Sequence, residues 1–378
     1  MEVPFAASRL GTLGVEWEIA LVDRDGRDLA SESDAVLAVL DERVPGHRVH
    51  RELLKNTVEL VTDVAGSVDE AMADLAESLD HVLAATDELG LDVFSAGMHP
   101  FAAWEAQEVT SAARYDTLID RTQYWGRQML IYGVHVHVGL PERDRVLPVL
   151  SSLLRYFPHL QALSASSPYY LGTDTGYAST RALLFQQLPT AGLPFQFQRW
   201  DEYEAYAGDL METGVIDTLN EIRWDVRPSP ALGTLEVRVC DAVTSFDRLA
   251  ALVALVQCLV VDLDRRAADG EELPVLPPWH VQENKWRSAR YGTDAIVVVG
   301  PGNREVLVTE HLAGEVARLQ PLARELGCEA ELLSAVELAS GETEYARQRR
   351  IVAEAGGDLA AVVVDSAQRL RAGASAHR

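Results

Sequence analysis

Four short segments of the chain alternate apolar and polar residues. They are residues 14–22 (GVEWEIALV), 57–62 (TVELVT), 134–140 (VHVHVGL) and 234–241 (TLEVRVCD). A period of two places successive side chains on opposite faces of a strand, so the pattern predicts four strands that each have one buried face.

Helical patterns occupy much of the sequence between these strands. Ser67 and Glu70 form a capping box, and apolar residues then recur with a period of about 3.6 until Gly90, a residue that commonly ends helices. Residues 247–266, rich in leucine, valine and alanine, predict a second long helix.

The C-terminal part of the chain, from about residue 305 to 371, also has a helical pattern, with Gly327 as an expected helix end. Strands separated by long helical insertions, with few hairpin signals, predict an α+β fold. No convincing boundary divides the sequence, so we expect residues 1–378 to form a single catalytic domain with a helical region from about 305.

Composition narrows the class of protein. Of 378 residues, 48% are hydrophobic and 24% charged, as in ordinary soluble globular proteins, and no apolar run approaches the roughly 20 residues that span a membrane. The N-terminal sequence has no signal-peptide pattern, and three widely spaced cysteines suit a reducing cytoplasm. A net charge of −25 argues against nucleic acid or an anionic membrane as a partner; the sequence leaves open whether the chain forms a homo-oligomer.

The four predicted strands carry ionisable side chains at positions two apart, which point to one face. These residues are Glu16 and Glu18, Glu59, His135 and His137, and Glu236 and Arg238. Taken singly, most have an ordinary explanation: a solvent-facing strand, a hydrogen-bonded histidine in a core or a surface ion pair. Glu59 differs, because a lone glutamate in an apolar strand needs a partner or a metal ion.

Taken together, these side chains predict a cation site. If the strands are neighbours in one sheet, a single face holds four carboxylates, two imidazoles and a guanidinium. The carboxylates on that face repel one another unless cations bind there. Oxygen-rich ligands with some imidazole suit Mg²⁺ or Mn²⁺ better than a closed zinc site. Such ions on a carboxylate-lined sheet are what the chemistry of ATP needs.

A basic cluster lies in residues 282–292 (QENKWRSARYG). Lys285, Arg287 and Arg290 fall within six positions, after a segment, residues 274–279 (PVLPPW), that predicts a loop. The cluster is either a basic surface loop or a binding site for phosphate groups, and in so acidic a chain we favour phosphate binding.

The ordered set of motifs resembles a known family, the glutamate–cysteine ligase type 2 (carboxylate–amine ligase) family. The resemblance runs from about residue 12 to 292, and the helical C-terminal part fits it less diagnostically. The motifs, in order, are GVEWE, NTVELVT, GVHVHVGL, SASSPYYLGTDTGYASTR, QQLPTAGLP, EIRWDVRPSP, GTLEVRVCD and ENKWRSARYG.

This resemblance implies a fold similar to the catalytic domain of glutamine synthetase. In that fold a curved, mainly antiparallel sheet holds the metals on its concave face, and helices pack on its other side. The resemblance also implies that ATP phosphorylates a carboxylate and that an amine then attacks, which gives an amide, ADP and phosphate.

The resemblance further implies roles for individual residues. Glu16 is expected on the metal between the β- and γ-phosphates, with His135 and Glu236 completing its shell. Glu18 and Glu59 are expected on the metal beside the substrate carboxylate.

Other roles concern the nucleotide and the acid. His137 is expected to touch phosphate or substrate, and Arg238 to stabilise the transferring phosphoryl group, so that Arg238, Glu236 and Glu59 form the catalytic set. Arg181 is expected to clamp the α-carboxylate of the acid, unless it is a surface residue. Asn56 is expected to bind substrate or only to cap its strand.

The predicted function is therefore an ATP- and Mg²⁺-dependent ligase for small molecules, with L-glutamate as the acid and L-cysteine or another amine as the acceptor. Three alternatives stay open at this point. A guanidino kinase would stop after phosphoryl transfer, a metal-dependent hydrolase would not need ATP, and a binding homologue would lack catalysis although every expected polar position is occupied.

Overall fold

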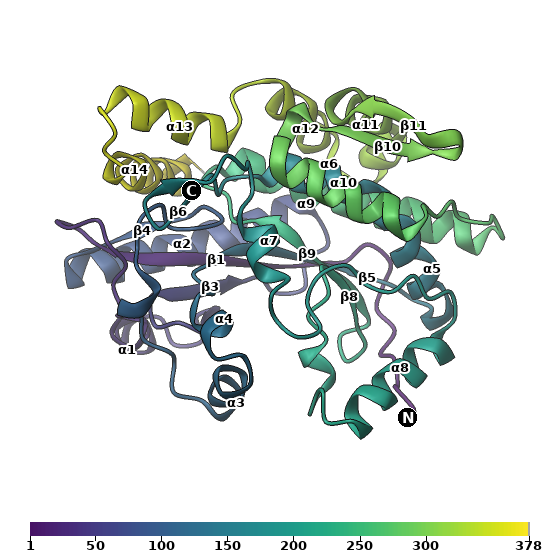
Figure 1. Cartoon of the computed structure of the whole chain (residues 1–378), viewed down its shortest axis with the longest axis horizontal. Helices are drawn as coiled ribbons and strands as arrows, with labels where there is room; N and C mark the ends of the chain where they lie inside the picture. The colour runs from purple at the N-terminus through teal and green to yellow at the C-terminus, as the bar shows by residue number, and fades with distance from the viewer. Residues whose placement is uncertain (377–378) are drawn as a thin grey trace.

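The centre of the molecule is a seven-stranded antiparallel sheet. The computed structural model describes residues 1–376 and places the strands in the order β2-β3-β1-β5-β9-β8, with β4 also paired to β1 (Figure 1). The strands are β1 (Leu13–Asp23), β2 (Val49–Arg51), β3 (Thr57–Val61), β4 (Leu91–Phe94), β5 (Gly133–Gly139), β8 (Val226–Ser229) and β9 (Thr234–Asp241). The four predicted strands are confirmed as β1, β3, β5 and β9, and the α+β class with them.

Helices make up most of the remaining chain. In order they are α1 (Ser33–Arg43), α2 (Val68–Leu89), α3 (Ala113–Thr122), α4 (Tyr124–Arg127), α5 (Arg143–Leu153), α6 (Phe157–Ser164), α7 (Arg181–Phe185), α8 (Trp200–Glu212), α9 (Phe246–Ala268), α10 (Pro278–Tyr291), α11 (Val308–Leu326), α12 (Glu329–Ser340), α13 (Glu344–Glu354) and α14 (Ala360–Ala376). Two small hairpins pair β6 (Tyr169–Tyr170) with β7 (Thr173–Asp174) and β10 (Ile296–Gly300) with β11 (Arg304–Leu307).

One face of the sheet is covered by helices α2 and α9. The odd-numbered residues Val15, Trp17 and Ile19 of β1 point to that side and are fully buried. Trp17 packs edge-to-face on Phe246, the first residue of α9, with ring centroids 5.4 Å apart. This packing leaves the even-numbered residues of β1 for the opposite face.

The ends of α2 lie where the sequence predicts, but the capping box is only half formed, because the Glu70 carboxylate accepts from the N–H of Gly66 instead of that of Ser67. The Ser67 side chain accepts a hydrogen bond from the backbone N–H of Glu70, at 3.2 Å. Gly90 follows the last turn in the left-handed region, with φ of 71°, which a residue without Cβ adopts at little cost.

Two predicted boundaries are wrong by a few residues. The loop expected over residues 274–279 ends earlier, because Pro278 begins α10, and proline suits the first helical turn, where a missing N–H costs nothing. Residues 305–307 belong to β11 instead of a helix, because the valine-rich β10 pairs with them. Helix α11 begins at Val308, and α12 follows after Gly327.

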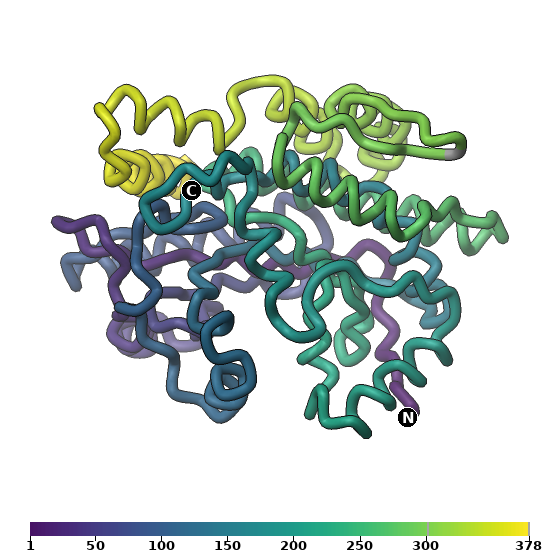
Figure 2. Tube along the Cα trace, viewed as in Figure 1, coloured from purple at the N-terminus to yellow at the C-terminus, as the bar shows by residue number. Residues whose placement is uncertain are grey.

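The two ends of the chain lie on opposite sides of the molecule (Figure 2). Near the N-terminus, the carbonyl of Val3 accepts a hydrogen bond from the Trp200 indole of α8, at 3.0 Å. In Figure 1, helices α13 and α14 lie above the sheet, whereas α3 and α8 lie below it. Across residues 1–376, no helix is both long and apolar enough to cross a membrane.

Candidate active site

The face of the sheet opposite α2 and α9 carries a row of ionisable side chains. Strand register brings them together: Glu16 lies opposite His135, Glu18 lies opposite Glu59, and Glu236 lies opposite His137. The predicted constellation on four strands is therefore one continuous site, although its members are far apart in the sequence.

Glu16 is held between the two histidines of β5. Its carboxylate oxygens lie 2.8 Å from His135 Nδ1 and 3.2 Å from His137 Nε2. Burial alone would raise the pKa of Glu16, but the hydrogen bonds from His135 and His137 outweigh burial and hold that pKa well below its ordinary value. Glu16 is therefore a stable carboxylate.

Glu236 is the most deeply buried acid of the site, with 1% of its side chain exposed. It accepts hydrogen bonds from Arg227 Nε, at 2.6 Å, and from Arg238. Burial raises its pKa, but Arg238 and Arg227 lower it by more, so Glu236 is also ionised. Burial, and then the charge of Arg238, lowers the pKa of the neighbouring His135 to about 4, so that this imidazole is neutral and can act as a ligand.

A second cluster of three carboxyl groups has weaker cationic support, because burial raises their pKa values by more than Arg114, Arg181 and Arg238 lower them. Oxygen atoms of Glu18, Glu52 and Glu59 lie within 4.8 Å of one another. Burial, and then the charge of Glu52, raises the pKa of Glu18 to about 8. Burial and the neighbouring carboxylates also hold the pKa of Glu59 well above its usual value. Near neutral pH this cluster therefore keeps protons that a cation could displace.

The donor atoms fit hard divalent cations. Besides the cluster of three carboxyl groups, two other sets of ligand atoms lie within 4.8 Å: Glu16 with His137 and Glu236, and Glu16 with Glu59 and His135. Carboxylate oxygens with a minority of imidazole nitrogens match the preferences of Mg²⁺ and Mn²⁺. Glu16 and Glu59 each belong to two sets, so the sets are contiguous.

Arg181 lies beside this cluster in the first turn of α7. It is 3% exposed, and its guanidinium donates to the carbonyl of Arg238, at 3.3 and 3.4 Å. Its Nε has no hydrogen-bond partner within residues 1–376. The backbone N–H of Gly133 donates to Glu18, and a Cβ on Gly133 would collide with the Arg181 guanidinium. Arg181 is thus buried against the site and not on the surface.

Asn56 lies at the start of β3 with its polar atoms already engaged. Its amide nitrogen donates to Gln107, at 2.8 Å. Its oxygen accepts from Thr57, at 2.8 Å, and from Tyr132, at 3.3 Å. These contacts fix the segment that carries Glu59.

The basic cluster lies on helix α10, so its members do not converge. Residues two apart on a helix are rotated by about 200°, which separates Lys285 from Arg287. Lys285 Nζ lies 2.6 Å from the Asp225 carboxylate, and both side chains are 4% exposed. Arg287 instead pairs with Glu283 and Glu305, on the outer side of the helix.

Arg290 takes a third direction. It donates to the carbonyl of Gly176 and stacks on Tyr177 and Tyr291, with its guanidinium carbon 5.6 and 5.0 Å from the ring centroids. Arg287 lines a cavity on the outer side of α10, whereas Lys285 lines a different cavity of the described structure, to which neither Arg287 nor Arg290 contributes.

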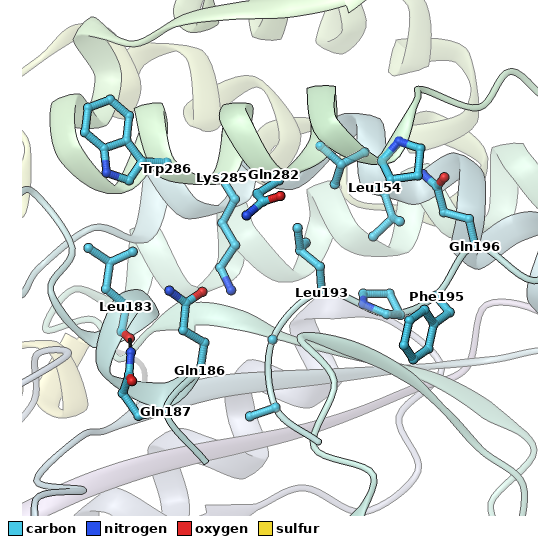
Figure 3. A pocket seen from close by; sticks show the side chains of 15 residues that line it. Leu154, Leu183, Gln186, Gln187, Leu193, Phe195, Gln196, Gln282, Lys285 and Trp286 are labelled. Atoms are coloured by element: carbon cyan, nitrogen blue, oxygen red, sulfur yellow. Dashed lines mark hydrogen bonds between the residues drawn. The ribbon is translucent and has the colours of Figure 1, made fainter. Parts of the chain in front are cut away.

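That cavity lies between α10 and the segment around α7 and has a volume of about 580 Å³. Figure 3 shows Lys285 pointing from the helix toward Gln186, with Gln282 beside it and Phe195 on the opposite wall. Asp225 connects the cavity to the acidic face, because its backbone carbonyl accepts a hydrogen bond from the N–H of Arg238, at 2.8 Å.

Sequence reasoning missed three residues of the site. Asp225 and Arg227 stand two apart within the motif EIRWDVRPSP, and this alternation around Val226 could have revealed β8. Glu52 gives no such signal. It precedes β3 in the segment RELLKN, outside any alternating pattern, and only the fold brings it to Glu18 and Glu59.

Comparison with known proteins identifies the family of the chain. Residues 12–365 match the profile of the family described as Glutamate-cysteine ligase family 2. A protein of Nocardioides sp. (strain ATCC BAA-499 / JS614), provisionally named glutamate–cysteine ligase 2-3, is 58% identical over 374 residues, which cover 99% of this chain and 100% of the relative. A protein of Arthrobacter sp. (strain FB24), provisionally named glutamate–cysteine ligase 2-1, is 54% identical over the whole of both chains.

Two solved structures share the fold at low sequence identity. One is the glutamate–cysteine ligase of Francisella tularensis in complex with AMP, with a TM-score of 0.69 and 14% identity, covering 99% of this chain and 90% of that one. The other is a bifunctional glutathione synthetase of Pasteurella multocida, with a TM-score of 0.72 and 16% identity, covering 96% of this chain and 52% of that longer one. The resemblance found in the sequence motifs is confirmed: this chain belongs to glutamate–cysteine ligase family 2.

Proposed function

We propose that this protein is an ATP- and Mg²⁺-dependent ligase that joins a carboxylic acid to an amine through an acyl phosphate. The observation that carries the proposal is the polar face itself, where two groups of carboxyl side chains meet at Glu16 and Glu59. One group is ionised and the other is protonated near neutral pH, an arrangement suited to binding more than one divalent cation. Such cations, when bound, bridge phosphate oxygens and offset the charge that develops in phosphoryl transfer.

The nucleotide is proposed to lie toward the β8–β9 end of the sheet. The cavity there is lined by Lys285 and four glutamines, which are Gln186, Gln187, Gln196 and Gln282. Amide groups can both donate to and accept from the edge of a purine, and apolar walls such as Phe195 can pack on its faces. His137 would then lie near the phosphates and Arg238 near the transferring group.

The acid is proposed to lie over Glu18 and Glu59, with Arg181 at its side. L-glutamate as the acid and L-cysteine or a related amine as the acceptor follow from the names of the relatives. Glu236 and Arg227 keep the Arg238 guanidinium in place. Cytoplasmic location is part of the proposal, since the three cysteines are free and buried.

Isotope labelling tests the chemistry directly. Glutamate labelled with heavy oxygen in its side-chain carboxylate is incubated with ATP, Mg²⁺, an accepted amine and unlabelled water. Activation through an acyl phosphate transfers one labelled oxygen to inorganic phosphate and forms ADP and amide in equal amounts. Label in AMP, or pyrophosphate as a product, would contradict the proposal.

The same assay separates the competing functions. A guanidino kinase would form ADP with a guanidino compound alone, without amide. A metal-dependent hydrolase would act without nucleotide. Mass spectrometry of the amide over a panel of acid–amine pairs also identifies the acceptor.

A further inference from the structure

A second cavity, of about 550 Å³, opens at the opposite end of the polar face, beside β2. Glu59 and Arg114 both line it, together with His47, His50 and Arg51. His50 lies opposite Glu59 in the pairing of β2 with β3, so the cavity continues the row of side chains beyond Glu18 and Glu59.

Two of the four basic side chains in this cavity have acidic partners within 4.0 Å. Arg51 pairs with Asp34, at 2.9 Å, and His47 lies 3.2 Å from Asp41. Arg114 differs: within residues 1–376 no carboxylate oxygen lies within 4.0 Å of its guanidinium, and its near contact is Tyr115. Arg114 is exposed to solvent, and its positive charge lowers the pKa of Glu52 in the acidic cluster, so its guanidinium faces the polar end of the sheet without being paired.

Arg114 and Tyr115 present donors in the same place. Arg114 donates to the Tyr115 hydroxyl, and its guanidinium carbon lies 4.4 Å from the tyrosine ring centroid. Because this hydroxyl accepts from arginine, its own proton remains for another acceptor. A planar guanidinium and a phenol side by side match the two oxygens of a carboxylate.

We infer that this cavity binds the non-reacting carboxylate of an amino-acid substrate, with Arg114 as its principal contact. The inference rests on the proposed function and deepens it, because it requires at least one substrate to carry a second charged group. The shared chemistry is a carboxylate, and its source is either the α-carboxylate of the acid or the carboxylate of the amine.

Calorimetric titration distinguishes these sources without turnover. Glutamate is compared with 4-aminobutyrate, and cysteine with cysteamine; each second compound lacks only the carboxylate in question. Titrations are made with Mg²⁺ and ADP present, into the wild type and Arg114→Gln. Loss of a charge-assisted pair predicts that the variant binds one parent amino acid about 10- to 100-fold more weakly. Its affinity for the matching analogue should change less than about twofold.

Two further variants complete the design. Arg114→Lys keeps the charge without the planar fork and should recover part of the lost affinity. Arg127→Gln removes an exposed arginine of α4 that does not line the cavity, and should behave as wild type. An unchanged preference for both parent amino acids in Arg114→Gln would overturn the inference, as would equal losses for parent and analogue. Amide formation is assayed separately, so a failure of the ligase proposal is recognised independently.

Discussion

At the scale of residues, the acidic face divides into side chains that have lost their protons and side chains that keep them. His135 and His137 stabilise the negative charge of Glu16, whereas burial and the neighbouring Glu52 carboxyl group favour the protonated form of Glu18. Four glutamates on one face of the sheet, with Glu52 beside them, thus divide into ionised and protonated groups, because their neighbours differ.

This division predicts that Mg²⁺ binding releases protons. With a pKa of about 8, Glu18 is protonated below that pH and must lose its proton to bind a cation. We expect the affinity for Mg²⁺ to rise with pH up to about 8, and the binding near pH 7 to release about one proton per cation at this cluster. Calorimetry in buffers of different ionisation enthalpy measures that number.

Glu18→Gln should abolish most of this proton release, whereas the surface variant Glu272→Gln should leave it intact. Linkage also fixes the sign for stability. Because the pKa of Glu18 is raised in the folded protein, its protonated carboxyl contributes in full to the stability of the metal-free fold below the pKa of Glu18 in the unfolded chain. That contribution is lost as the pH rises through about 8. Proton release that is the same in the wild type and in Glu18→Gln would show that Glu18 does not bind the cation.

At the scale of elements, helix α10 is joined to the sheet by one buried ion pair, Lys285 with Asp225. Breaking such a pair leaves an unpaired buried charge, so Lys285→Met should lower the free energy of unfolding by about 3–5 kcal/mol. The double variant Lys285→Met with Asp225→Leu should recover most of this loss. Urea unfolding followed by fluorescence measures each value.

The only other lysine of the chain gives a matched control. Lys55 forms an exposed pair with Glu108, and Lys55→Met should change stability far less. The double variant at Lys285 and Asp225 also tests the nucleotide site, because it restores the fold without the ammonium group. Wild-type affinity for ATP in that variant would limit Lys285 to an anchoring role.

The same helix shows where sequence reasoning stops. Alternation identified β1 and β5 because the apolar residues of each strand pack on one side of the sheet and the ionisable residues lie on the other. The expectation of a single buried face fails for β5, since all its residues are buried, His135 and His137 included. In the basic run, by contrast, three cations close in sequence suggested one binding site, but a helix turns Lys285 and Arg287 to opposite sides. Glu52 joins the site through tertiary structure alone, so no local pattern could have identified it.

At the scale of the whole molecule, the net charge of −25 opposes the approach of an anionic nucleotide. Arg227 and Arg238 offset only part of the negative electrostatic potential that an approaching nucleotide meets, because both arginines pair with Glu236. Raising NaCl from about 20 to about 200 mM at fixed Mg²⁺ should therefore increase the association rate constant of ATP by about two- to tenfold.

Stopped-flow fluorescence with a labelled ATP analogue measures this rate. A labelled, uncharged adenosine serves as the control, and its association should depend little on salt. A rate constant for ATP that falls with added salt would show instead that the local cationic groups steer the nucleotide against the field of the whole chain.

The pairing order of the central sheet also affects how the chain is made. Strand β1 lies between β3 and β5. Strand β5 also pairs with β9, which carries Glu236 and begins more than half the chain after β1 ends. At ordinary rates of translation that interval is on the order of tens of seconds. Strand β5 is made about halfway through this interval, so β1 can pair with β5 before β9 exists. The ligand set of Glu18, Glu52 and Glu59 is complete once β3 is made, whereas the set that contains Glu236 needs β9. The cation site is therefore assembled in steps as the chain is translated.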